Sequence, residues 1–166
     1  MINEIDFNEI FLVDLDTACA AIGNCELSFP FSSCYEANRQ EKMVKLFEQS
    51  QIILLTIGEL VSNPDRIVSY HDYLKEYTEK IDELITDFED DDSIRLESIV
   101  GKIIPNAENA DLMLAHSLVN NAKISSSHAS HIWAYTAINS VQRLLFFLVR
   151  YTTSYIEQWE GLKEKN

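Results

Sequence analysis

The segment from His128 to Lys163 constrains the fold of this chain most, because it is long, apolar and almost without charge. Its interior, residues 132–159, holds three charged residues at intervals of seven: Arg143, Arg150 and Glu157. Residues seven apart share one narrow stripe of an α-helix, so most of the remaining surface can pack against other elements. We predict one long helix, which forms either the centre of a helical bundle or half of an oligomer interface.

The rest of the chain also favours helices. It has four glycines and three prolines among 166 residues, whereas all-β folds use many of both in turns. Apolar residues recur at intervals of three and four. The helices predicted from these intervals cover residues 3 or 7 to 21, 33–36 to 61, 64–88, 94–104, 106 to 120 or 123, and 128–163. We therefore predict a single helical domain over residues 1–166: an all-α, mostly antiparallel bundle of five or six helices with the long apolar C-terminal helix at its centre.

Particular residues mark where these helices should begin and end. Gly23-Asn24 is expected to end the first helix, and residues 25–34 then form a long loop. Asn63-Pro64 suits the start of the third helix. The run Ser125–Ser127 is expected to separate the last two helices and to cap the final one.

Acidic residues outnumber basic ones 27 to 13, which gives a formal net charge of −14. Residues 1–38 contain seven acids and neither Lys nor Arg, and a second acidic block covers residues 72–97. Such a surface repels nucleic acid and anionic membranes and attracts basic proteins. The candidate partner-binding residues are Glu4, Asp6, Glu9, Asp72, Glu76, Glu79, Glu83, Asp87, Glu89, Asp90, Asp91 and Asp92.

These acids lead to our first functional hypothesis, a binding or inhibitor protein. A small acidic helical chain suits an immunity protein, an antitoxin or a phage-type inhibitor that neutralises a basic toxin or nuclease by charge complementarity. Some such proteins imitate DNA by displaying carboxylates. The alternative interpretation is that the acids form a solubilising face, because net charge bears on solubility as readily as on partners.

A second hypothesis comes from Arg66 and His71, which stand five residues apart. The spacing resembles the Arg-x4-His motif of the HEPN family, compact helical ribonucleases that usually act as dimers. The resemblance implies that His71 is the general base or acid and that Arg66 stabilises phosphate charge. It covers these two residues and the helical class, and the residue after the arginine, often polar in that family, is Ile67 here.

A third hypothesis is a structural bundle that oligomerises through the last helix. A homodimer would use the apolar residues Ile138, Leu145, Leu148 and Tyr155. This arrangement is compatible with either of the other two functions.

Metal and cofactor chemistry finds little support in the sequence. His128 and His131 are three apart, which alone is a weak metal pattern. The run from Asp87 lacks the glycine and the final glutamate of a calcium loop. The three cysteines, at positions 19, 25 and 34, are odd in number and none is arranged as Cys-x-x-Cys, which argues against a disulfide framework and a zinc site. We predict no metal and no cofactor.

The chain is expected to be cytoplasmic. Its acidic N-terminus does not resemble a secretory signal, and the longest nearly apolar runs, residues 51–57 and 144–149, are shorter than the roughly 18 residues of a membrane-spanning helix.

Overall fold

The computed structural model describes residues 4–28, 37–89 and 110–164, and this part of the chain is all-α. It contains the helices α1 (Phe7–Ser28), α2 (Ala37–Ser62), α3 (Ile67–Glu89), α4 (Ala110–His128) and α5 (Ile132–Glu164), with a short 3-10 turn, η2 (Pro64–Arg66), before α3. The predicted fold class is confirmed for these residues. The predicted helix at 94–104 and Cys34 lie outside the described residues.

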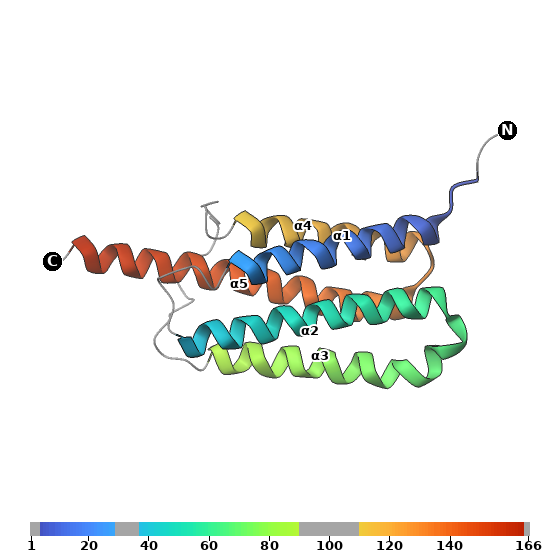
Figure 1. Cartoon of the computed structure of the whole chain (residues 1–166), viewed down its shortest axis with the longest axis horizontal. Coiled ribbons are helices and arrows are strands. Elements are labelled where there is room, and N and C mark those ends of the chain that lie inside the picture. Colours follow the sequence, from blue (N-terminus) through green and yellow to red (C-terminus); the bar gives the residue numbers. More distant parts are fainter. Residues whose placement is uncertain (1–3, 29–36, 90–109, 165–166) are drawn as a thin grey trace.

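The helices form an elongated bundle in which most neighbours are antiparallel (Figure 1). Helix α1 packs against α4 and α2, α4 packs against α5, and α3 packs against α2 and α5. Helices α2 and α5 also meet, which closes the bundle across its middle. The exception to the antiparallel pattern is the pair α3 and α5, which run in the same direction (Figure 1).

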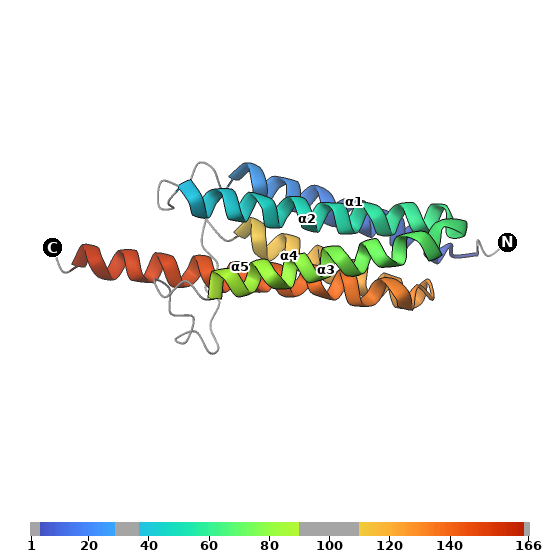
Figure 2. The same cartoon turned by 90° about the horizontal axis from the view of Figure 1, so that it is seen from below.

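Helix α5 is a core helix over its first half and not a helix enclosed on all sides. Its buried residues include Ile138, Leu145 and Leu148, all without exposed surface. Ile132 on the same helix is 79% exposed, and the C-terminal part of α5 projects beyond the other helices in both views (Figure 1, Figure 2). The chain's own core therefore uses three of the four side chains that were predicted to face a second copy. The fourth, that of Tyr155, lies outside the described side chains.

One segment of α5 also meets the length and composition of a membrane-spanning helix. Residues Ile132–Val149 have a mean hydropathy of 1.3, and 56% of this segment is buried inside the bundle. The sequence prediction compared only uninterrupted apolar runs with the length of a membrane span. It therefore did not identify this segment, which includes Thr, Asn and Ser. The core helix of a helical bundle has the same length and composition, because its packed side is apolar. The burial of this segment agrees with that role.

The prediction that α1 ends at Gly23-Asn24 is wrong, because the helix continues to Ser28. Gly23 faces the Gln51 side chain of α2: a Cβ added at Gly23 would stand 3.0 Å from Nε2 of Gln51. Cys25, predicted to begin a loop, is fully buried in the core. Contact with α2 and burial of the next turn thus outweigh the helix-ending tendency of the Gly-Asn pair.

The prediction that Ser125–Ser127 separates two helices is also wrong, since α4 continues to His128. The hydroxyl of Ser125 donates to Asp14 of α1, and that of Ser126 donates to the carbonyl of Lys123. Because these hydroxyls find partners inside the bundle, buried serines do not interrupt the helix.

The end of α4 is a Schellman motif two residues after the serine run. The amide of His131 donates to the carbonyl of Ser126 at 2.8 Å, and the amide of Ser130 donates to that of Ser127 at 3.2 Å. Ser130 has a φ of 62°, the left-handed conformation that this motif requires and that glycine usually supplies. A tight turn then leads into α5.

Candidate functional site

Four exposed acids form one straight row along α3: Asp72, Glu76, Glu79 and Glu83. Their intervals of four, three and four residues keep all four within a narrow angular range of the helix. Leu74 and Ile81, on the opposite side of α3, are buried in the core. The core contact of α3 therefore fixes the direction of this row, which we call the α3 acidic row.

Most of the α3 acidic row has no ion-pair partner among the described residues. Glu76 pairs with Lys80 at 2.9 Å, and its hydrogen bond raises the pKa of that lysine. Lys80 also lies 5.2 Å from the centre of the Tyr77 ring. The structure gives no ion pair within the described region to Asp72, Glu79 or Glu83, so three of the four carboxylates are available to a cation from outside.

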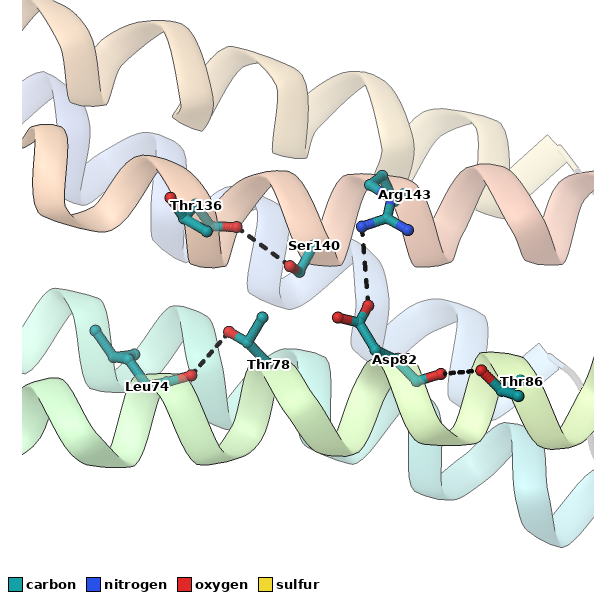
Figure 3. Close-up of polar contacts among 7 residues, drawn as sticks. All are labelled: Leu74, Thr78, Asp82, Thr86, Thr136, Ser140 and Arg143. Atoms are coloured by element: carbon teal, nitrogen blue, oxygen red, sulfur yellow. Dashed lines mark hydrogen bonds and ion pairs between the residues drawn. The ribbon is translucent and has the colours of Figure 1, made fainter.

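A neighbouring acid on α3 has a different role. Asp82 faces α5, where its carboxylate lies 3.8 Å from the guanidinium of Arg143 (Figure 3). Both side chains are at least half exposed, so the pair contributes little to stability. Asp82 therefore faces a neighbouring helix, unlike the acids of the α3 acidic row.

The N-terminal candidates lie in the segment that leads into α1 and in the first turn of that helix. Glu4, Asp6 and Glu9 are all exposed. The carboxylate of Asp6 accepts from the amides of Asn8 at 3.0 Å and Glu9 at 3.2 Å, so Asp6 is the N-cap of α1. The trio lies at the N-terminal end of α1, which packs against α4 and α2, whereas the α3 acidic row belongs to a helix that packs against α2 and α5.

The remaining acidic candidates are only partly visible. Asp87 and Glu89 lie in the last turn of α3, and their side chains are outside the described set. Asp90, Asp91 and Asp92 lie outside the described residues.

The pair that suggested a ribonuclease lies across the junction of η2 and α3. Arg66 is the last residue of η2, and its side chain is not among those described. His71 is exposed and lines a cavity of about 390 Å³ between α3 and the start of α5. The other described polar lining comes from Lys75, Thr78, Glu79 and Thr136, beside the ring of Trp133.

His128 and His131 do not lie on a helix start, as the sequence predicted, but at the end of α4 and in the turn after it. The ring of His128 stacks on Phe7 with centroids 6.0 Å apart, and that of His131 stacks on Phe11 at 5.6 Å. The two rings thus pack on different phenylalanines of α1, and the described residues contain no group of three or more His, Cys, Asp or Glu that could hold a metal.

Both ring nitrogens of His131 are engaged. Nε2 lies 2.6 Å from Oδ1 of Asn8, and Nδ1 accepts from the indole of Trp133 at 3.3 Å. This arrangement suits a neutral ring with its proton on Nε2. Burial lowers the pKa of His131 in agreement with that state, so the residue acts as a link between the N-terminal turn and the α4–α5 turn.

Sequence reasoning missed a groove between α1 and α2, with a volume of about 500 Å³. It is lined by Leu12, Leu15, Asp16, Cys19, Leu54, Leu55, Gly58, Glu59 and Ser62. We call it the α1–α2 groove. It could not be seen in the sequence because its two walls are about 40 residues apart; the one local hint was an isolated glycine inside an apolar helix.

Comparison with protein-family models, with curated proteins and with solved structures finds no match. The functional conclusions below therefore come from the residues and their arrangement.

Proposed function

We propose that this chain is an acidic helical binding or inhibitor protein, of the immunity-protein, antitoxin or phage-inhibitor type, which acts in the cytoplasm by neutralising a basic protein partner. The observation that carries the proposal is the α3 acidic row, in which Asp72, Glu79 and Glu83 are exposed and have no ion-pair partner in the described part of the chain. Charge complementarity then speeds capture of the partner and selects it.

The geometry of α3 supports a protein partner with a line of Lys or Arg residues. Intervals of three to four residues along a helix place successive carboxylates about 4.5–6 Å apart along its axis. Exposed carboxylates keep their hydration until a partner arrives, so the row contributes mainly to the rate of association and to its dependence on salt. The net charge of −14 supports the same conclusion, because it disfavours nucleic acid as the partner.

The alternative is the HEPN-like ribonuclease with Arg66 and His71. The observation in its favour is that His71 lines a cavity together with Lys75 and Glu79, which offers a base and a cation near one another. In that case the surface acids would only solubilise the protein, and substitution of His71 would remove the activity.

A salt-dependent capture experiment with matched variants tests the proposal. The tagged chain is incubated with lysate of its native cell at low and at high salt, and retained proteins are identified by mass spectrometry. The variant Asp72→Asn/Glu79→Gln removes two charges seven residues apart from the α3 acidic row. The control Glu41→Gln/Glu48→Gln removes two exposed charges with the same spacing from α2.

We expect one basic protein to be retained by the wild type and the control at low salt, and to be lost at high salt. With the row variant we expect its affinity to fall by about tenfold. Equal retention by row variant and control would contradict a role of the α3 acidic row. Retained RNA, cleaved by the wild type and not by His71→Ala, would support the ribonuclease instead. Light scattering of the purified chain tests the homodimer predicted through the last helix.

A further inference from the structure

Gly58 is the starting observation, because packing does not require a glycine there. A Cβ added to Gly58 would have its nearest neighbour, Cδ2 of Leu12, at 4.0 Å, an ordinary van der Waals distance. Glycine inside a helix is destabilising relative to alanine. At Gly23, by contrast, the Cβ would stand 3.0 Å from Gln51. The missing side chain at Gly58 therefore leaves the α1–α2 groove open without any gain in helix packing.

The α1–α2 groove combines an apolar floor with acidic edges. Leu12 from α1 and Leu54 and Leu55 from α2 line it, and Leu55 is 55% exposed. Asp16 stands on the α1 side and Glu59 on the α2 side, both exposed. Its described lining includes neither Lys nor Arg.

Cys19 also lines the α1–α2 groove, on the same helix as Asp16. Burial and the nearby carboxylate of Asp16 raise the pKa of this thiol. The thiol is therefore protonated at neutral pH and is a poor nucleophile. Cys19 therefore adds no charge to the groove, and the charged residues of its described lining are Asp16 and Glu59.

Two contacts set the register of the groove walls. Leu12 lies beside Gly58, and the carbonyl of Cys19 accepts from the side chain of Gln51 at 3.2 Å. In this antiparallel pair, Asp16 of α1 lies at the same height along the axis as residue 54 of α2, and Glu59 of α2 lies at the height of residue 11 of α1. Asp16 and Glu59 are thus on opposite edges of the groove. The five residues from 11 to 16 separate them by roughly 7.5 Å along the axis.

We propose that the α1–α2 groove binds an amphipathic helix of the basic partner, in which an apolar stripe contacts Leu12 and Leu55 and two Lys or Arg residues, five or six positions apart, pair with Asp16 and Glu59. Five or six residues of a helix cover about 7.5–9 Å and place the two cations on opposite flanks of the stripe. Recognition of an amphipathic helix in a groove is an established mode of binding. The inference rests on the proposed basic partner but uses a surface other than the α3 acidic row.

The test uses a synthetic fluorescent probe, a helix with a leucine stripe flanked on both sides by lysines, and measures its affinity by fluorescence anisotropy. A peptide of the same composition in scrambled order, without an apolar stripe, is the reference ligand. We expect the probe to bind the wild type at least about tenfold more tightly than the reference.

Two groove variants should weaken binding of the probe. Gly58→Phe fills the groove, and Asp16→Asn/Glu59→Gln removes both edge charges while changing only exposed side chains; we expect each to weaken the probe by about tenfold. Glu41→Gln/Glu48→Gln, which removes two exposed charges of α2 outside the groove lining, is the matched control, for which we expect a change below about threefold. Circular dichroism checks that each variant is folded.

Three results would overturn the inference: equal affinity for probe and scrambled peptide, unchanged affinity in Asp16→Asn/Glu59→Gln, or loss of probe binding only in the row variant Asp72→Asn/Glu79→Gln. The last result would place the probe on α3 and leave the proposed function standing. If the groove variants weaken the probe but the capture experiment retains no basic protein, the proposed function fails and the groove remains a peptide site.

Discussion

At the scale of single residues, two glycines within one helix pair have opposite roles. Gly23 of α1 permits a close approach, because Nε2 of Gln51 occupies the space next to it and donates to the carbonyl of Cys19. Gly58 of α2 borders the α1–α2 groove with room for a side chain. The first glycine is a packing requirement, and the second weakens the helix without any packing benefit.

We therefore expect Gly58→Ala to stabilise the fold by about 0.5–1 kcal/mol, the usual helix-propensity difference. Gly23→Ala should be less favourable by about 1 kcal/mol, because Gln51 must move and give up its hydrogen bond. Urea unfolding of both variants measures the difference.

The variant Gln51→Ala is the control for this pair of substitutions. In the Gln51→Ala variant, Gly23→Ala should stabilise the protein as much as Gly58→Ala does, because the Gln51 side chain no longer occupies the space beside residue 23. Equal free energies of unfolding for the two single variants in the wild-type background would show that Gln51 does not constrain Gly23.

At the scale of elements, the turn between α4 and α5 determines where the last helix begins. The Schellman motif ends α4, and Ser130 occupies its left-handed position with a φ of 62°. The next residue, His131, then lies against Phe11 and bonds to Asn8. The strained conformation of Ser130 thus places His131 against the N-terminal turn of α1.

We expect Ser130→Gly to raise the free energy of unfolding by about 0.5–1 kcal/mol, because it relieves the left-handed strain and only part of this gain is lost to the extra freedom of the unfolded chain. Ser130→Val should lower it, since a β-branched residue fits this conformation poorly. Urea unfolding tests both. A stabilising valine would be incompatible with the turn geometry described above.

At the scale of the whole molecule, a net charge of −14 acts against a compact fold. Many acids on α1 and α3 are exposed, and the described ion pairs are few and at the surface, such as Glu41 with Lys45 at 3.1 Å. Self-repulsion therefore lowers stability, and the apolar core made by all five described helices opposes it.

We expect sodium chloride to stabilise this protein, because salt screens the repulsion between carboxylates. From low ionic strength to about 0.5 M, the melting temperature should rise by roughly 3 °C or more, which is about 1 kcal/mol for a chain of this size. Calorimetry measures it. The variant Asp72→Asn/Glu79→Gln, which removes two exposed carboxylates without an ion pair in the described region, should show a smaller rise. A melting temperature that falls with salt would mean that attractive pairs dominate.

The local part of the candidate site could be predicted from the sequence, and the rest could not. The acids at positions 72, 76, 79 and 83 share one face of any helix with 3.6 residues per turn, and the apolar residues at 74 and 81 require that this face point outward. The roles of Asp6 and Asp82 could not be predicted from the sequence. Asp6 caps α1 and Asp82 pairs with Arg143 of α5, and both contacts depend on the folded positions of the groups involved.

The sequence by itself determined that this chain is helical, because the scarcity of glycine and proline and the spacing of apolar residues act along a single segment. Tertiary structure decided where α1 and α4 end, which residues of α5 the core uses, and that a groove opens beside Gly58. The physical reason is that contacts between residues far apart in the chain, such as Gln51 with Gly23 and Ser125 with Asp14, outweigh local preferences worth about 1 kcal/mol or less.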